Sequence, residues 1–212
     1  MPKNQSILSI IWSSIWKSLL ISILVTLVVS IALGYKFIFV NGWSAEPDIH
    51  YKSIIVTTKT DFKNLNEGDF ITFKNNSSYV THKIIAIKRD GYFQKGEVFV
   101  ATINGEQYKM VYGSNKAYGM DTPDENIDKT GLSDDLRKDC NIITMQRSET
   151  PDANKDCVNF QKNFVGQVIY TNYPIGLTID LVKNNPLILI GLVGCFVLLI
   201  IYKDQTEISI QY

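Results

Sequence analysis

The sequence feature that most constrains the fold is a long apolar run near the N-terminus. No charged residue occurs between Leu19 and Leu33, and the run is rich in Leu, Ile and Val. An α-helix rises about 1.5 Å per residue, so roughly 20 residues cross a hydrocarbon core about 30 Å thick. We therefore predict a transmembrane helix over residues 18–40.

The residues before this run are of the kinds found at a membrane–water interface. Trp12, Trp16 and Lys17 combine apolar bodies with polar ends, and such side chains settle at headgroup level. Residues 1–17 are therefore expected to form a cytoplasmic or interfacial segment. A cleaved secretory leader is the alternative, but the run is long for a leader and no Ala-x-Ala-like cleavage sequence follows it.

A second apolar run, PLILIGLVGCFVLLIIY, occupies residues 186–202. It is apolar on all sides rather than on one stripe, which favours a membrane span over a core helix. Two spans would leave residues 203–212 as a short tail on the same side as the N-terminus. Residues 41–185 would then form a single domain on the other side.

The orientation of the two predicted spans follows from the charges that flank them. Lys3 and Lys17 precede the first span, although Lys36 lies at its opposite end. Basic residues are enriched on the cytoplasmic side of membrane spans. The expected arrangement is a multi-pass membrane protein with two spans, cytoplasmic termini and an extracytoplasmic domain.

The polar middle of the chain has the pattern of short strands separated by turns. Its β-branched and aromatic segments are bounded by NEGD, NNSS and RDGY, which are typical turn sequences. These features predict a mainly β domain, with residues 104–160 as an insertion or a long loop system. The predicted strands cover residues 53–58, 68–73, 79–88, 97–103 and 165–170.

The composition excludes several classes of function. Lys and Arg together number 21, as do Asp and Glu, so no basic excess suggests nucleic-acid binding. The two histidines and three cysteines do not have the spacing of metal ligands. No metal and no other cofactor is therefore expected.

The cysteines leave one structural question open. Cys140 and Cys157 lie in the polar middle of the chain, whereas Cys195 lies in the second apolar run. A Cys140–Cys157 disulfide would be consistent with an oxidising, extracytoplasmic compartment. Two free thiols are an equally acceptable interpretation.

One serine and one histidine are candidates for nucleophilic chemistry. Ser44 follows the first apolar run in NGWSAEPDI, where a turn could present its hydroxyl at the bilayer surface. Serine needs a base within hydrogen-bond reach, and His82 lies in the predicted strand YVTHKIIAI. Taken alone, each has a plainer interpretation, as a turn serine and a structural histidine. His50 is expected to be a surface residue.

Five short segments follow one another along the chain: GWSAEP, GDFITF, THKII, TPDENID and VGQVIYTNYPIG. In order and approximate spacing they resemble the type I signal peptidase family. That family has a Ser-Met-x-Pro box after a membrane anchor, a Gly-Asp-hydrophobic strand, a base followed by Arg, an acidic box and a final Gly-x-Val strand. The resemblance covers most of residues 18–175 and implies a signal-peptidase-like β domain with serine endopeptidase activity.

The resemblance also implies the catalytic base. The family's base falls on His82 and its following Arg falls on Lys83, so the chain is similar to the endoplasmic-reticulum and archaeal branch, which uses a Ser-His pair. The alternative base is Lys83, as in the Ser-Lys branch. That assignment slides the box by one residue, which moves the side chain to the opposite face of the strand.

The acid is expected in the segment KAYGMDTPDEN. An imidazole base works best when a carboxylate orients its other nitrogen, and the Pro-Asp of the family's acidic box matches Pro123 and Asp124. Asp124 is therefore the first choice, Asp121 is the second and Asp128 is a distant third.

Two positions in the serine box depart from the family pattern. Ala45 replaces the Met that follows the nucleophile, and Gly42 stands where the family often has a hydroxyl residue that helps to stabilise the oxyanion. Losing one oxyanion donor costs on the order of 3 kcal/mol of transition-state stabilisation. The resemblance thus implies a peptidase that cleaves slowly or that stabilises the oxyanion with a different set of donors.

The function expected from this resemblance is removal of signal peptides from exported precursor proteins. Ser44 would attack the scissile carbonyl, His82 would transfer the proton, and Asp124 would orient the imidazole. The implied partners are signal-peptide-bearing precursors, the lipid bilayer and export or conjugation machinery. The alternatives are a peptidase dedicated to a pilin or conjugation precursor, an inactive protein of the same fold, and an unrelated adhesion or assembly protein.

Overall fold

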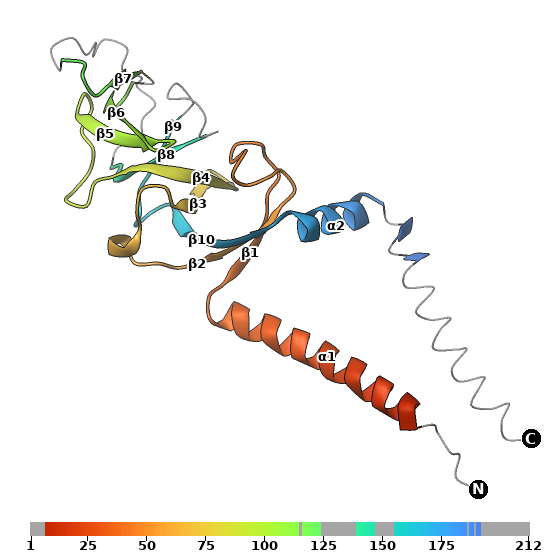
Figure 1. Ribbon diagram of the computed structural model, residues 1–212. Coiled ribbons are helices and arrows are strands. Elements are labelled where there is room, and N and C mark those ends of the chain that lie inside the picture. The colour runs from red at the N-terminus through yellow and green to blue at the C-terminus, as the bar shows by residue number, and fades with distance from the viewer. Residues whose placement is uncertain are drawn as a thin grey trace, which may run out of the picture.

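The computed structural model describes residues 7–114, 116–123, 139–146, 155–185, 187–188 and 190–191. Within this part of the chain the protein is mainly β, with two antiparallel sheets and two α-helices (Figure 1). The elements, in chain order, are α1 (Ile7–Ala32), β1 (Lys36–Phe39), β2 (Ile54–Thr58), the 3₁₀ turn η1 (Phe62–Asn64), β3 (Phe70–Asn75), β4 (Ser78–Ile87), β5 (Val98–Ile103), β6 (Glu106–Val111), β7 (Ala117–Gly119), β8 (Ile142–Met145), β9 (Lys155–Val158), β10 (Phe164–Asn172) and α2 (Tyr173–Asn184).

Helix α1 contains the apolar run and is exposed over almost all of Ser14–Ala32. The stretch Ser14–Ala32 is long and apolar enough to cross a membrane, and none of its most apolar window is buried. Ser30 Oγ donates to the Thr26 carbonyl at 2.7 Å, which satisfies its hydroxyl within the helix. The chain therefore has one N-terminal helix with the properties of a membrane span, a description that a signal sequence also meets.

A glycine determines where α1 ends. Gly34 has a φ of 86°, and its N–H donates to the Ile31 carbonyl at 3.0 Å. The Tyr35 N–H donates to the Ser30 carbonyl at 3.1 Å. This pair of hydrogen bonds around a left-handed glycine is a Schellman motif. The helix thus ends at Ala32 instead of continuing to residue 40, and the residues that follow form strand β1.

The larger sheet has seven strands in the order β1-β2-β10-β3-β4-β8-β9, and each neighbouring pair is antiparallel. The prediction of a mainly β domain is confirmed. The predicted strands agree with β2, β3, β4, β5 and β10, and each end differs by no more than two residues. Strand β10 inserts between β2 and β3, so the last strand of the chain is central to the sheet. Its insertion links the N-terminal and middle parts of the domain.

The segment predicted to be irregular contains regular structure. Strand β6 follows β5 through Asn104 and Gly105, which have φ angles of 53° and 84°. Asn-Gly with positive φ at both positions is the preferred two-residue hairpin turn. Strands β6, β7, β8 and β9 all fall within residues 104–160, so the prediction of a mere loop system was wrong for the described part of this segment.

Among the described residues, three clusters of buried apolar side chains hold the domain together. The largest packs β4 and β8 against the three-stranded sheet β5-β6-β7 and includes Ile85, Met110 and Ile143. The second lies on the opposite side of β3 and β4 and includes Phe73 and Ile84. The third cluster, Val40, Ala45, Ile49 and Ile55, lies at the end of the sheet nearest α1.

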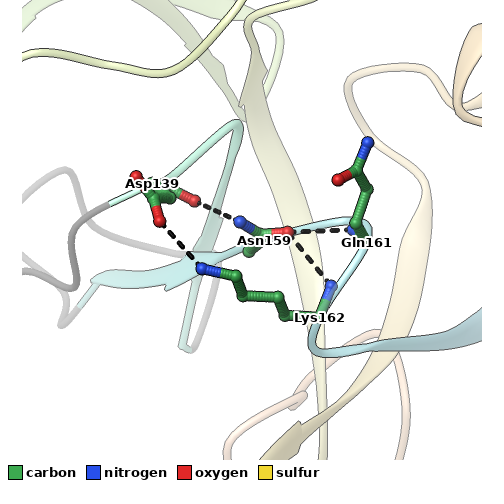
Figure 2. Close-up of polar contacts among 4 residues, drawn as sticks. All are labelled: Asp139, Asn159, Gln161 and Lys162. Carbon is green, nitrogen blue, oxygen red and sulfur yellow. Dashed lines mark hydrogen bonds and ion pairs between the residues drawn. The ribbon is translucent and has the colours of Figure 1, made fainter.

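A set of polar contacts fixes one end of the β8–β9 pair, where β8 begins and β9 ends (Figure 2). The Asn159 side chain donates to the Asp139 carbonyl at 2.8 Å and accepts the N–H groups of Gln161 and Lys162 at 2.9 and 3.0 Å. Lys162 Nζ also pairs with Asp139 Oδ2 at 2.8 Å. The segments before β8 and after β9 are thereby held together, and β9 is placed in register beside β8.

Helix α2 begins directly at the end of β10 and packs on β2. Asn172 is its N-cap, because its side chain accepts the Ile175 N–H at 2.8 Å. The second predicted span, residues 186–202, lies almost entirely outside the described residues. Both α1 and α2 leave the domain at the end formed by β1, β2 and β10, away from the sheet β5-β6-β7 (Figure 1).

Candidate active site

The predicted nucleophile lies in a loop that joins β1 to β2, which we call the serine loop (residues 40–53). Two backbone hydrogen bonds close its base: the Val40 N–H donates to the Ser53 carbonyl at 2.8 Å, and the Lys52 N–H donates to the Val40 carbonyl at 2.9 Å. Ser44 lies in the turn at the far side of the loop.

Two buried residues that follow Ser44 anchor the turn. Ala45 and Ile49 are almost fully buried and pack near Phe70 of β3, while the Ile49 N–H donates to the Ala45 carbonyl at 2.9 Å. Ser44 itself is half-buried and its neighbour Trp43 is 57% exposed. The backbone is therefore anchored from below, and the hydroxyl remains at the edge of the domain.

Ala45, which stands where the family has Met, contributes its methyl group to the third buried cluster. Gly42 is different, because a Cβ added there would lie 3.8 Å from Ser44 Oγ, which is an ordinary contact. The position two residues before the serine therefore has room for a side chain beside the hydroxyl.

Glu46 organises the inner side of the serine loop. Its Oε1 accepts the Tyr51 N–H at 2.7 Å, and its Oε2 lies 3.1 Å from His50 Nδ1. The Trp43 and Tyr51 rings stack with their centroids 4.5 Å apart. His50 is exposed, as predicted, and its imidazole lies beside the Glu46 carboxylate.

His82 lies on β4 with no exposed surface. It is paired across the sheet with Ile71 of β3, and its ring meets the edge of the Phe73 ring at a centroid distance of 5.6 Å. Its Nδ1 lies 2.9 Å from Oδ2 of Asp156 on β9, although these atoms are not aligned as a hydrogen bond. A histidine that sequence alone cannot distinguish from a structural one thus has a carboxylate against one nitrogen.

The other ring nitrogen of His82 is the more unusual group. His82 Nε2 is buried and has no hydrogen-bond partner among the described residues. Leaving such a group unsatisfied costs about 1–3 kcal/mol of stability, and buried polar atoms of this kind call for a specific explanation. A neutral imidazole whose Nδ1 bears the proton would have its lone pair on this nitrogen.

Lys83, the alternative base, points to the other face of β4. Successive side chains of a strand alternate between faces, and Lys83 Nζ lies 2.6 Å from Oδ2 of Asp48 in the serine loop. The ammonium also lies 5.2 Å from the centre of the Phe70 ring. The Lys83 side chain is thus engaged with the serine loop on the face of β4 opposite to His82.

The structure brings some of the predicted residues together and leaves others apart. The Lys83–Asp48 pair ties the serine loop to the face of β4 opposite to His82. Within the described residues, however, no hydrogen bond joins Ser44 to His82. Asp124 and Asp128 lie outside the described residues, and Asp121 is exposed in the turn that follows β7.

Asp156 is the residue that sequence reasoning missed. It lies in KDCV, which forms β9 and pairs with β8 so that Asp156 is opposite Thr144. In this segment Asp156 is followed by two consecutive buried residues, Cys157 and Val158, so no alternating pattern marks the strand in the sequence. The pairing of β9 with β8 beside β4 brings its carboxylate to the histidine.

The two cysteines of the domain are free thiols. Cys140 and Cys157 are both buried in the largest apolar cluster, and the Tyr112 hydroxyl donates to Cys157 Sγ at 3.4 Å. The pKa of the Cys140 thiol is raised, mainly by burial and secondly by a hydrogen bond with Cys157. Of the two interpretations left open by the sequence, the structure has the unbonded one.

Within the described residues, no group of three or more His, Cys, Asp or Glu side chains is placed to hold a metal ion. No family model matches the chain, and the search of curated proteins found no match.

Proposed function

We propose that this protein is a membrane-bound serine endopeptidase that removes signal peptides from exported precursors, with Ser44 as the nucleophile. The observation that carries the proposal is the environment of His82: a carboxylate oxygen 2.9 Å from Nδ1, and a buried Nε2 without a partner among the described residues. A general base has a carboxylate close to one ring nitrogen and a second nitrogen that can accept a proton, and the position of Asp156 supports this role for His82.

In this mechanism His82 accepts the proton of Ser44 as the hydroxyl attacks the scissile carbonyl. Asp156 takes the role that the sequence assigned to Asp124, and stabilises the imidazolium that forms. His82 then returns the proton to the leaving amine, and water hydrolyses the acyl-enzyme by the same route in reverse. Because the serine loop contacts Phe70 and Lys83, on the face of the β3–β4 pair opposite to His82, the reaction requires the serine loop to move so that the Ser44 hydroxyl reaches Nε2 when substrate binds.

The exposed position of the serine loop at the α1 end of the domain supports a substrate that arrives from the membrane. The signal-peptide substrate class rests on the sequence resemblance, and the two-span topology rests on the two apolar runs. Lys83 is assigned a structural role here, since its ammonium pairs with Asp48.

The test is cleavage of a signal-peptide-bearing precursor by the full-length protein in detergent micelles. Ser44→Ala should reduce kcat by at least about 10³-fold, because the nucleophile acts as a unit with its base. Ser78→Ala is the matched control, since it removes an exposed hydroxyl from the β3–β4 turn region, and it should cleave at the parental rate. Equal rates for Ser44→Ala and the parent would refute the assignment, and a parental protein without activity would favour the inactive-fold alternative.

A further inference from the structure

Helix α2 is seated on the domain by one narrow face. A Cβ at Gly176 would lie 1.9 Å from the Lys52 carbonyl and 2.7 Å from the Ile54 nitrogen, so the helix touches the backbone of β2 and the preceding loop at this point. Asp180, one turn further on, pairs with Lys52 at 2.7 Å. The face that carries these two residues is therefore covered by protein.

The other faces of α2 are apolar and exposed. Ile175 and Ile179 form one stripe with a spacing of four residues, and Leu177 and Leu181 form another, and all four side chains are at least 42% exposed. Thr178 donates its hydroxyl to the Pro174 carbonyl at 2.9 Å, so this polar group is satisfied within the helix. The Thr178 hydroxyl therefore needs no hydrogen bond from water, and the exposed side chains beside it are apolar.

The neighbouring exposed side chains are those of a membrane interface. Tyr173, at the start of α2, meets His50 of the serine loop with ring centroids 5.5 Å apart. Trp43 and Tyr170 are each more than half exposed. Amphipathic aromatic side chains of this kind concentrate at the level of lipid headgroups.

The position of α2 in the molecule indicates what covers this surface. α2 leaves the domain at the same end as α1, whose Ser14–Ala32 stretch has the properties of a membrane span (Figure 1). The sequence after α2 continues into the second apolar run, residues 186–202. A bilayer crossed by α1 would lie beside this end of the domain, within reach of an apolar helix joined to it.

We propose that α2 is an interfacial helix that lies in the headgroup region of the bilayer, with its Ile175 and Leu181 sides toward the acyl chains. The contacts of α2 with Lys52 and His50 then place the serine loop at the membrane surface. An amphipathic helix with Trp and Tyr beside it and a lysine near its end fits a lipid surface. This inference does not depend on the proposed peptidase activity.

The test uses the full chain, carrying Cys195→Ser, in phosphatidylcholine–phosphatidylglycerol nanodiscs with one copy per disc. Nitroxide labels are placed at Ile175→Cys, Leu181→Cys and, as the control, Val100→Cys on β5, which is an exposed apolar position far from α2. Collisions with oxygen, which partitions into the bilayer, are compared with collisions with a water-soluble nickel chelate. Cys140 and Cys157 are buried and should remain unlabelled.

The proposal predicts that the oxygen-to-nickel collision ratio is several-fold higher for the labels on α2 than for the label at Val100. Equal ratios at the three positions would overturn it, because α2 would then lie in water. Low collision rates with both reagents at Leu181 would also overturn it, since that result means that protein covers the helix. The readout is independent of proteolysis, so an inactive protein can still confirm the docking of α2.

Discussion

Replacing Gly176 with alanine sets two energetic effects against each other. In an exposed helix, Ala is more favourable than Gly by about 1 kcal/mol, so helix propensity alone predicts a more stable protein. The structure predicts the opposite, because the new Cβ would lie 1.9 Å from the Lys52 carbonyl and 2.7 Å from the Ser53 carbonyl carbon. Both neighbours are backbone atoms, so no rotation of a side chain can relieve the contact.

The expected magnitude follows from these two terms. Overpacking of a close contact costs about 1–3 kcal/mol and occasionally more, and the absence of a flexible neighbour places Gly176→Ala at the upper end. Subtracting the gain in helix propensity leaves a net loss of roughly 2 kcal/mol in the free energy of unfolding. For a protein of this length, that loss lowers Tm by about 4–8 °C.

The assay is thermal unfolding of the full chain in detergent micelles, followed by near-ultraviolet circular dichroism. Gly191→Ala is the matched control, because Gly191 is also helical and a Cβ there would meet nothing within 4 Å. That variant should keep or slightly raise Tm. If Gly176→Ala does the same, α2 is not seated on β2 at this glycine, and the reasoning that fixes α2 beside the serine loop fails.

Four further predictions concern the candidate site and the core. Asp156→Asn should lower kcat by orders of magnitude with little change in KM, because its carboxylate acts through the imidazole. Asp121→Asn should cleave at nearly the parental rate. A severe Asp121→Asn defect with a normal Asp156→Asn variant would reverse the assignment. Lys83→Met should retain measurable cleavage, and complete inactivation without loss of folding would transfer the base to the lysine. The Cys140 thiol should react slowly with iodoacetamide up to mildly alkaline pH in the folded protein, because burial raises its pKa and suppresses the thiolate, and rapid labelling would show that this cluster is open. Gly42→Ser should raise kcat by about tenfold or more if the added hydroxyl reaches the oxyanion, and an unchanged kcat would show that the site is complete without it.

Several features of this protein follow from local sequence. The uncharged run from Leu19 to Leu33 dictates a long apolar helix whatever surrounds it. Alternating β-branched and aromatic residues predict most of the strands, because a side-chain period of two matches a half-buried sheet. The serine loop was also located correctly between the helix and the first long strand, since Pro47 and its polar neighbours mark a turn.

Other features depended on contacts between segments far apart in the chain. β8 and β9 are short and flanked by polar residues, so their strand character comes from pairing beside β4 rather than from their own pattern. The end of α1 was misplaced, because the glycine that stops it is followed by apolar residues that continue the hydrophobic pattern into β1.

The sequence by itself determined the classes of residue available for chemistry: one serine beside an apolar helix, two histidines and many carboxylates. Only the tertiary structure decided which of them meet. Asp156 approaches His82 from a strand 74 positions later in the chain, and the pairing order β4-β8-β9 alone brings them together. The carboxylate nearest in a sequence motif and the carboxylate nearest in space need not be the same residue, because the register of a sheet is set by the burial of whole strands.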